Sequence, residues 1–482
     1  MFYDGPLYIM DKYSVRPLRN GKKFTVTVPG SKSITNRALL LAAMCRGKCT
    51  LTGVLFSDDS RAFLSCLNTL GYRLDINEEA KTVTIEGGAG TIPGILPAIP
   101  GENVSREDTE RRIPSLNVGS AGTAARFLTV FLAFAGGEYH LDSSKQMRKR
   151  PMEPLISDLR RAGVEITCTE EDGHFPFIIR SSGVNVSEMS SNTDVSSQFA
   201  SAIIMAAPLL KNGLTLKLEG SRTTGSYIGI TLNMMSQFGL GYTRKGNTVE
   251  ILTGYGQNHT QADPICGNDV QDQNTVHTPV WQINNPSVYD IEPDMSAACY
   301  FYAMAPICGR IMQVRGVHPY SMQGDFQFIR TMEKLGCSTE DDPDGVILNP
   351  PVNGIYPGID INMKDYSDQT MTMAVVAAFA SSPSAIHDIG HIRFQESDRL
   401  NAITNELNRL GCECTAIDGN TGIHIKPQSM HGAEIETYDD HRIAMAFALA
   451  GLRVQGVTIL NPMCCRKTFE DYFDVLDSIT VQ

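Results

Sequence analysis

Carboxylates and cations gather at two places in the last quarter of the chain, each directly before an apolar run with helical spacing. Asp368 precedes the run 370–380, and the segment Gln395-Glu-Ser-Asp-Arg399 precedes the run 400–410. Carboxylates at the start of a helix often do no more than complement its dipole. They carry out acid–base catalysis when a dry, charged pocket brings the pKa of one of them into the working range. Both interpretations of Asp368 and Glu396 stay open from the residues alone.

Basic and hydroxyl side chains occupy other expected helix starts in the same way. A Pro-Gly turn ends a β-prone run, and Lys32, Ser33 and Arg37 follow at the start of an apolar helix. Such a start offers free N–H groups and the positive end of the dipole to an anion. Capping, tight packing or a solvated face would explain any one such stretch. The comparable stretches are Gly119–Arg126, Met147–Pro151, Asp194–Gln198, Tyr438–Ile443 and Cys465–Phe469.

The composition narrows the class of protein. The 482 residues carry a net charge of -12, which argues against a general nucleic-acid binder and against attraction to an anionic membrane. No CxxC pair or HExxH pattern occurs, so the sequence predicts neither a metal site nor a disulfide framework. No apolar run approaches the ~18 residues of a membrane span, and no secretory leader is evident. We expect a cytoplasmic protein that binds no metal.

One pattern recurs along the chain: an amphipathic helix, a glycine placed to end it, and a short β-prone run. A second, more apolar helix lies between successive copies. Two turn-rich stretches, 87–115 and 253–286, interrupt the spacing and are interpreted as loop insertions. Without them the chain divides into six units of roughly 70 residues, a repeat architecture with three units in each of two domains. The glycines are Gly71, Gly163, Gly239, Gly336 and Gly411.

Nine segments, in this order, resemble the 5-enolpyruvylshikimate-3-phosphate synthase (3-phosphoshikimate 1-carboxyvinyltransferase) family. They span Pro29 to Phe473, almost the whole chain, and together are far more specific than any one of them. The segments are PGSKSITNRALLLAA, GSAGTAARF, MRKRPMEPL, DVSSQF, SYIGITLNMM, SMQGDF, QESDRL, YDDHRIAM and CRKTFEDYF.

The resemblance implies an α/β (α+β) fold of two domains, each built from three βαβαββ units, with the active site in the cleft between them. The implied boundaries are 32–291 for one domain and 1–31 plus 292–482 for the other. The implied reaction, in the shikimate pathway of aromatic amino acid biosynthesis, transfers the carboxyvinyl group of phosphoenolpyruvate to the 5-hydroxyl of shikimate 3-phosphate. It needs no cofactor, and we expect a monomer.

The resemblance also implies roles for individual residues. Asp368 and Glu396 would be the acid–base carboxylates, and Lys32 would contact both substrates. Arginine suits such a site because its planar fork meets carboxylates and phosphates with two hydrogen bonds. The implied shikimate 3-phosphate contacts are Lys32, Ser33, Arg37, Ser196, Ser197, Gln198, Thr224, Asp368, His391 and Gln395. The implied phosphoenolpyruvate contacts are Lys32, Gly122, Arg150, Gln198, Arg399, Arg442 and Lys467.

Three positions depart from the family pattern. Ser120 replaces the usual Asn, Gln395 replaces a common Lys, and His391 stands at a position of Asn type. Without that Lys, a cation that contacts shikimate 3-phosphate and could depress the pKa of Glu396 is missing. We therefore expect weaker binding of shikimate 3-phosphate or a shifted pH optimum.

Two other functions remain as alternatives. The sister enzyme that transfers carboxyvinyl to UDP-N-acetylglucosamine shares the fold, but it resembles PGxKN at the first stretch and carries a reactive Cys in its first half. This chain has Lys32-Ser33 and no Cys between Cys66 and Cys168, which disfavours it. A non-catalytic homologue that binds an anionic metabolite is the second alternative, because fold does not guarantee function.

Overall fold

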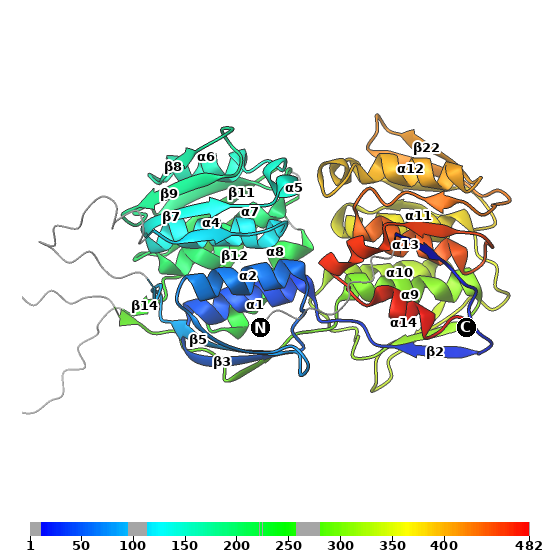
Figure 1. The fold of residues 1–482 in the computed structure, drawn as a ribbon, viewed down its shortest axis with the longest axis horizontal. Helices are drawn as coiled ribbons and strands as arrows, with labels where there is room; N and C mark the ends of the chain where they lie inside the picture. Colours follow the sequence, from blue (N-terminus) through cyan, green and yellow to red (C-terminus); the bar gives the residue numbers. More distant parts are fainter. Residues whose placement is uncertain (1–10, 95–112, 221, 224, 257–279, 482) are drawn as a thin grey trace, which may run out of the picture.

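Two lobes lie side by side in the computed structural model, which describes residues 11–94, 113–220, 222–223, 225–256 and 280–481 (Figure 1). Each lobe has its own hydrophobic core. One core is built from residues between Ile34 and Ile291, and the other from residues 13–28 together with Met295 to Ile479. Two separate cores indicate two domains. We call them the first and the second domain, and the boundaries given above remain a proposal.

Six sheets of related topology account for most of the strands. In five of them, four strands form three neighbouring pairs, of which the first is parallel and the other two are antiparallel. The sixth, β1-β25-β24, has one parallel and one antiparallel pair. In four of the sheets a helix joins the first pair of strands, and in the other two α1 and α9 occupy the same place beside the pairs β16–β3 and β2–β17. Each sheet with its two helices thus forms one βαβαββ unit or, in the sixth case, a shortened one. The six-unit organisation predicted from the sequence is therefore present.

The first domain holds three of these units. They are β16 (Val288–Asp290), α1 (Lys32–Met44), β3 (Arg46–Thr52), α2 (Asp58–Thr69), β4 (Arg73–Asn77) and β5 (Thr82–Gly88); then β6 (Ser115–Asn117), α4 (Gly122–Ala135), β7 (Gly137–Asp142), α6 (Glu153–Arg161), β8 (Glu165–Cys168) and β9 (Phe177–Ser181); then β10 (Glu188–Asn192), α7 (Ser197–Ala206), β11 (Leu214–Glu219), α8 (Ser226–Gln237), β12 (Tyr242–Lys245) and β13 (Thr248–Ile251).

The second domain holds the other three. They are β2 (Lys23–Val26), α9 (Met295–Cys308), β17 (Ile311–Val314), α10 (Gln327–Lys334), β18 (Ser338–Glu340) and β19 (Ile347–Asn349); then β20 (Asp360–Asn362), α11 (Thr370–Ala378), β21 (Ser384–His387), α12 (Arg399–Arg409), β22 (Glu413–Ile417) and β23 (Gly422–Lys426); then β24 (Glu434–Ile435), α13 (His441–Gly451), β25 (Thr458–Leu460), α14 (Tyr472–Asp477) and β1 (Lys12–Ser14).

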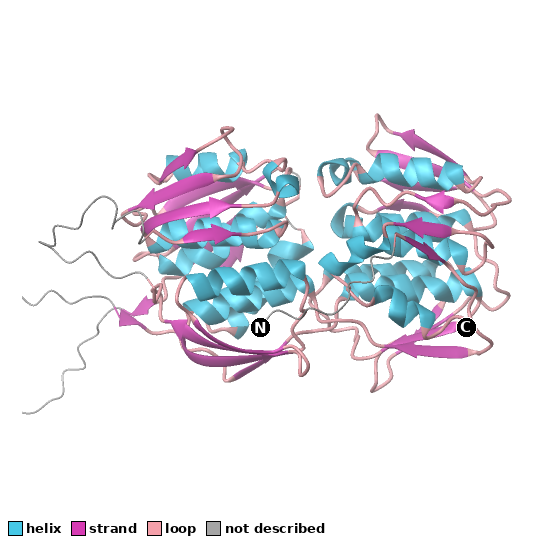
Figure 2. Cartoon of the chain, in the orientation of Figure 1, coloured by secondary structure: helices cyan, strands magenta, loops and turns pink. Residues whose placement is uncertain are grey.

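Helices gather inside each lobe and strands lie towards its outside (Figure 2). The first helix of each unit is buried on almost every side, as α4 and α9 show. Such helices are apolar around their whole circumference because no face meets water. The second helices are amphipathic, as predicted, and end at the five expected glycines. These have φ values between 77° and 91°, which only glycine adopts readily.

The two domains exchange strands where the chain passes between them. β2 precedes the first crossing and pairs with β17 of the second domain, while β16 precedes the return and pairs with β3 of the first. The two crossings are hydrogen-bonded side by side: Ser31 N–H donates to Glu292 O and Asp294 N–H to Pro29 O, both over 2.8 Å. A Cβ at Gly30 would lie 1.8 Å from Gly53 O, so this close approach requires glycine.

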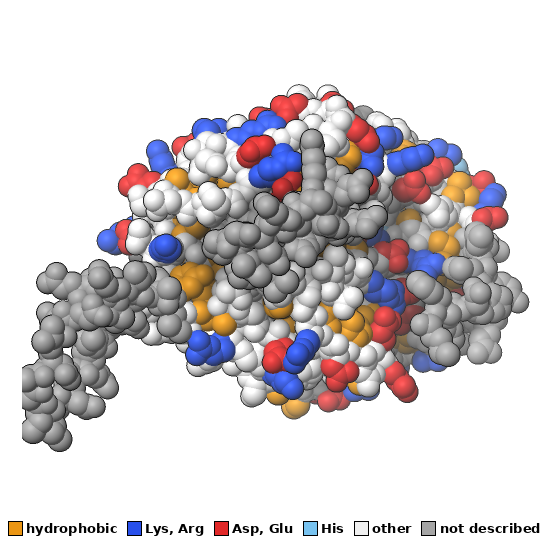
Figure 3. Space-filling model, turned by 60° about the vertical axis from the view of Figure 1, so that its left-hand side comes forward, with side chains coloured by type: hydrophobic (Ala, Val, Ile, Leu, Met, Phe, Trp, Pro, Cys, Tyr) orange, Lys and Arg blue, Asp and Glu red, His pale blue; other side chains and the backbone are white. Residues whose placement is uncertain are grey.

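The two predicted insertions lie largely outside the described residues. At the edges of the second, β14 (Tyr255–Gly256) pairs with β15 (Val280–Trp281), and the Trp281 ring packs against Tyr255 and Gly90. On the face shown in Figure 3, basic and acidic side chains are interspersed among the described residues. Within the described ranges, no helix is both long enough and apolar enough to cross a membrane.

Candidate active site

The buried helices bring their N-termini to a pocket between the two domains. This pocket holds about 570 Å³ of space not filled by protein atoms, part of it open to solvent. The starts of α1, α9 and α13 all line it, so the positive ends of three helix dipoles meet there. A pocket with this lining favours anions. Its charged and hydroxyl residues include Lys32, Ser33, Ser226, Ser296, Asp325, His441 and Arg442.

Asp294 joins two of these helix starts across the crossing between the domains. One of its oxygens accepts the N–H of Lys32 over 3.0 Å, and the other accepts the N–H of Ala297 over 2.9 Å. The same carboxylate therefore caps α1 of the first domain and α9 of the second. This contact fixes the backbone of Lys32 relative to the second domain.

Asp368 ends the short helix η3 (Lys364–Gln369) in a ring of donors from both domains. Arg442 Nη2 lies 3.1 Å and Arg399 Nη1 3.2 Å from its oxygens, and Tyr227 Oη of the first domain donates to it over 2.6 Å. Burial by itself raises the pKa of Asp368, but the two guanidiniums and the phenol outweigh burial and hold it well below its ordinary value. Asp368 is therefore an ionised, fully hydrogen-bonded carboxylate.

Arg399 connects Asp368 with the start of α13. Its Nε lies 2.7 Å from Asp440 Oδ2 and its Nη2 3.3 Å from Asp440 Oδ1, a bidentate pair. Its remaining Nη1 donates to Asp368 and to Gln395 Oε1. Gln395 thus faces Arg399 as an acceptor, a contact that a lysine could not make.

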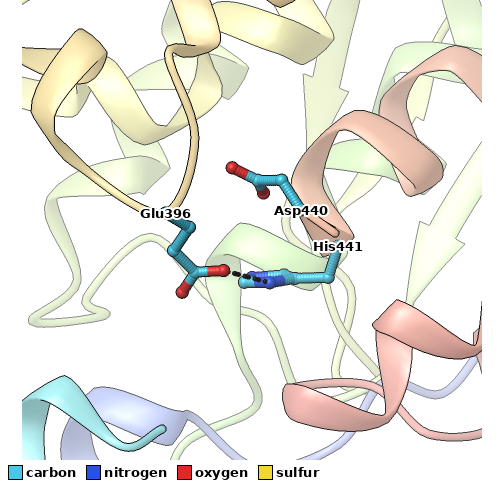
Figure 4. Close-up of side chains that lie close together, drawn as sticks. All are labelled: Glu396, Asp440 and His441. Carbon is cyan, nitrogen blue, oxygen red and sulfur yellow. Dashed lines mark ion pairs between the residues drawn. The ribbon is translucent and has the colours of Figure 1, made fainter. Parts of the chain in front are cut away.

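Glu396 lies among cationic or protonatable groups on the other side of Arg399. His441 Nδ1 is 3.0 Å and Lys467 Nζ 3.4 Å from Glu396 Oε2, which accepts no hydrogen bond from a described residue (Figure 4). Burial raises the pKa of Glu396, but His441, Lys467 and Lys32 outweigh it and hold the pKa well below the ordinary value. Burial is the largest influence on His441 and lowers its pKa, while the carboxylate of Glu396 acts in the opposite direction.

Glu396, Asp440 and His441 offer three ligand atoms within 4.8 Å of one another, so a metal ion is worth testing here (Figure 4). The oxygens of Asp440 already accept from Arg399, Ser397 and the N–H of Arg442. A divalent ion would also lie beside the ammonium of Lys467 and the guanidinium of Arg399. The donor set therefore fits a hydrogen-bonded charge network better than a metal.

Lys32 and Arg37 are buried to different degrees on α1. The ammonium of Lys32 pairs with the buried carboxylate of Asp59. Arg37 is 1% exposed, and its guanidinium donates to Thr231 Oγ1 over 2.8 Å and to the Ser33 carbonyl over 2.9 Å. Burial lowers the pKa of Arg37 to about 10. These contacts fix the guanidinium of Arg37 beside the start of α1.

A second group of cations surrounds the start of α4. Arg126 Nη1 donates to Gln198 Oε1 over 2.7 Å, and Arg150 lies close enough to lower the pKa of Arg126 in addition to burial. A Cβ at Gly122 would stand 2.6 Å from Arg126 Nη1 and 2.8 Å from Arg150 Nη1. Gly122 thus makes room for both guanidiniums. Lys467 reaches this group from the second domain, since its Nζ lies 3.4 Å from Gln146 Oε1 of α5 (Lys145–Arg148).

Comparison with known proteins identifies the family. The family model described as EPSP synthase (3-phosphoshikimate 1-carboxyvinyltransferase) matches residues 22–476. The chain belongs to this family. A protein of Trichormus variabilis named 3-phosphoshikimate 1-carboxyvinyltransferase is 34% identical over 464 residues, covering 96% of this chain and 98% of its own. The Vibrio campbellii protein of the same name is 35% identical over 474 residues, covering 98% of this chain and 100% of its own.

The fold matches as well. A solved structure of EPSP synthase from Acinetobacter baumannii superposes with a TM-score of 0.74 at 22% identity, covering 98% of each chain. The two-domain α/β (α+β) prediction is therefore confirmed, and so is the assignment of the chain to an enzyme family. The alternative based on UDP-N-acetylglucosamine is not favoured.

The remaining predicted residues lie in the first domain, except for His391, which belongs to the second. Ser196 caps α7 by accepting the N–H of Gln198 over 3.2 Å, and Ser197 is the first residue of that helix. His391 Nε2 lies 2.7 Å from Ser367 Oγ, and burial is the main cause that lowers the pKa of His391 to about 4. The departure at Ser120 pairs its hydroxyl with Ser144 over 2.7 Å. Thr224 lies outside the described residues.

Sequence reasoning did not single out several residues that shape the site. Tyr227 and Asp440 lie inside quoted segments, yet their partners are far away in the sequence, so no local spacing marks them. Asp59 and Asp294 serve as partners of Lys32 and resemble ordinary helix-start carboxylates. A signal was available for Asp440, because two adjacent carboxylates before His and Arg are an unusual concentration of charge.

Proposed function

We propose that this protein transfers the carboxyvinyl group of phosphoenolpyruvate to the 5-hydroxyl of shikimate 3-phosphate and releases phosphate. One observation supports this most directly. Two largely buried, ionised carboxylates, Asp368 and Glu396, contact Arg442 and His441, which line the pocket where helix starts from both domains meet. Two anionic substrates need such cations, and an addition–elimination reaction needs two groups that exchange protons.

The reaction has two balanced steps. In the first, C3 of the enol accepts a proton while the 5-hydroxyl oxygen bonds to C2 and gives up its own proton. In the second, the C2–O bond to phosphate breaks, C3 loses a proton, and the C2–C3 double bond forms again. One group must therefore donate and then accept the C3 proton, and another must accept the hydroxyl proton. No electrons are exchanged with a third compound, so the steps require no redox cofactor.

The surroundings of the two carboxylates suggest which proton each of them transfers during the reaction. Asp368 lies next to Tyr227 and also lines a second pocket with Ser197 and Gln395, so we assign it to the 5-hydroxyl of shikimate 3-phosphate. Glu396 lies next to Lys467 and His441, and we assign it to C3 of phosphoenolpyruvate. Positioned cations act on the charge that develops during such a reaction, usually the largest catalytic contribution.

The other proposed contacts follow the same division. Lys32 lines the larger pocket and acts on Glu396 through its charge, and we propose that it contacts both substrates. For shikimate 3-phosphate we propose Ser33, Arg37, Ser196, Ser197, Gln198, Thr224, Asp368, His391 and Gln395. For phosphoenolpyruvate we propose Gly122, Arg150, Gln198, Arg399, Arg442 and Lys467.

Substrate binding has to change the protonation of Glu396 before it can act as an acid. In the free protein the carboxylate is ionised because His441, Lys467 and Lys32 surround it. The phosphate and carboxylate of phosphoenolpyruvate would bind these cations and bring negative charge close to Glu396. Both changes raise the pKa of Glu396 and allow it to accept the proton that it then donates to C3.

The test is phosphate release by the purified protein with phosphoenolpyruvate and shikimate 3-phosphate, supplied together and separately. We expect release only with both, and a loss of roughly 10²- to 10⁴-fold in kcat for Glu396→Gln. Glu413→Gln, which changes an exposed carboxylate of β22 in the same domain, is the matched control and should keep full activity. Shikimate 3-phosphate that binds in calorimetry without any turnover would instead support the non-catalytic alternative.

The proposal also covers the oligomeric state and the cellular location of the protein. We infer a monomer, to be checked by light scattering, and a cytoplasmic location. The eleven described cysteines are all free thiols, which suits a reducing compartment.

A further inference from the structure

A second, smaller pocket between the domains contains two cations that the functional assignments above leave unused. Arg222 precedes α8 of the first domain, and Lys364 begins η3 of the second. Both line the pocket, which holds about 350 Å³ of space not filled by protein atoms, part of it open to solvent. Ser197, Ser367 and Gln395 line it as well.

Neither cation is paired with a carboxylate that the structure describes. No ion pair within 4 Å joins Arg222 or Lys364 to any of these residues, whereas Arg399 and Arg442 both have such partners. Both nevertheless act on the site electrostatically. Arg222 helps to lower the pKa of Asp368, and both cations help to lower that of His391. A half-buried cation without a counter-charge is available to a bound anion.

Carboxylates at the pocket do not cancel this charge. Asp368 is neutralised by Arg399 and Arg442. Asp325, which also lines the pocket, accepts hydrogen bonds from Gln369 over 3.0 Å and from Ser296. Asp365 is exposed to solvent. The other basic candidate on this side, His391, is kept neutral by burial, and Gln395 brings no charge.

We propose that Arg222 and Lys364 bind the phosphate group of shikimate 3-phosphate from opposite domains, assisted by the hydroxyl of Ser197. The inference rests on the function proposed above and identifies residues beyond those carried over by resemblance. It also changes the expectation raised by Gln395: the cation missing at that position is supplied by two others in the same pocket.

The test compares shikimate 3-phosphate with shikimate, which lacks only the phosphate. Calorimetry should show that Arg222→Gln and Lys364→Gln each weaken binding of shikimate 3-phosphate by roughly 10- to 100-fold and leave binding of shikimate unchanged. Arg222→Lys should retain most of the affinity. Arg73→Gln and Lys426→Gln, which remove one exposed charge from each domain away from the pocket, are the matched controls.

The second part of the test is to restore the lost affinity with a second substitution. Gln395 lines the same pocket, so Gln395→Lys placed in the Arg222→Gln background should restore affinity for shikimate 3-phosphate. Equal weakening of shikimate and shikimate 3-phosphate, or no weakening of either, would overturn the inference. Failure of the proposed function looks different: the unmodified protein would then neither bind shikimate 3-phosphate nor release phosphate. In steady-state assays the variants should raise KM for shikimate 3-phosphate and change kcat by less than about threefold.

Discussion

Asp368 and Glu396 are both largely buried, and both have a pKa held below the ordinary value, but their partners differ in kind. Asp368 is paired with two arginines and accepts a hydrogen bond from a tyrosine. Glu396 lies beside a histidine and a lysine and accepts no hydrogen bond at Oε2 from the described residues. An arginine does not release its proton in a protein, whereas histidine and lysine can.

The difference separates a fixed charge from an adjustable one. Around Asp368 the charges are permanent, so its own charge is needed to balance them and its position is fixed. Around Glu396 the balance can be restored by moving a proton, which suits a group that must both donate and accept one. Two carboxylates whose pKa values are both depressed can therefore have different roles, because only Glu396 has neighbours that can release a proton.

Stability provides the most severe test of this comparison. Asp368→Asn leaves Arg442 buried without a carboxylate and should lower the free energy of unfolding by about 3–5 kcal/mol. Glu396→Gln should lower it by clearly less, because Lys467 and His441 can lose a proton or remain neutral. Urea unfolding of both variants at pH 7 measures the two values. Equal losses would show that the kind of partner does not matter.

At acid pH the ionised carboxylate of Asp368 should no longer stabilise the folded protein. A carboxylate whose pKa is depressed in the folded state contributes stability above its unfolded pKa of about 4, and that contribution is lost as the pH falls below this value. The gap in unfolding free energy between the unmodified protein and Asp368→Asn should therefore be full above about pH 5 and narrow below pH 4. Urea titrations at several pH values will show it, and a gap that does not depend on pH would contradict the low pKa of Asp368.

Binding of phosphoenolpyruvate should be linked to proton uptake at Glu396. Its pKa rises when the substrate engages Lys467, so the complex takes up a fraction of a proton near neutral pH. Calorimetric titration in buffers with different ionisation enthalpies measures this number directly. Glu396→Gln should abolish the uptake while Glu413→Gln preserves it. Proton release on binding would have the wrong sign for an acid at C3.

A small effect is expected where the domains touch at the surface. Arg61 of α2 lies 3.3 Å from Glu470 of the second domain and 2.8 Å from Glu78. The three side chains are between 38% and 51% exposed, so solvent and salt weaken the pair. Glu470→Gln should change kcat/KM by less than about threefold at moderate salt. A larger change in steady-state assays would show that surface charges, and not only the buried network, control how the domains meet.

The sequence predicts the repeated parts of this molecule well because each repeat is local. Helix periodicity and the glycines that end the second helices are read within a dozen residues, and all five glycines occupy the left-handed conformation. The helix starts that carry Lys32, Ser196 and Asp440 also follow from local chemistry. These local signals identify the repeat units and the polar or charged helix starts within them.

What the sequence does not reveal depends on pairing across long distances. Tyr227 reaches Asp368 over 141 positions, and Asp294 caps Lys32 over 262. That no described carboxylate pairs with Arg222 or Lys364 can be seen only once the surroundings of each are known. The strand exchange is hidden for the same reason, since β2 alone cannot show whether it pairs with β3 or with β17.

This exchange also sets an order of assembly during synthesis. The first domain can complete its sheets once β16 has left the ribosome, because all its other strands are already available. The second domain needs β2 and β1 from the beginning of the chain, yet β1 pairs with β25, where Lys12 lies opposite Leu460. The strand β2 can therefore pair only after β17 has been made, and β1, the first strand of the chain, can pair only when almost the whole polypeptide exists.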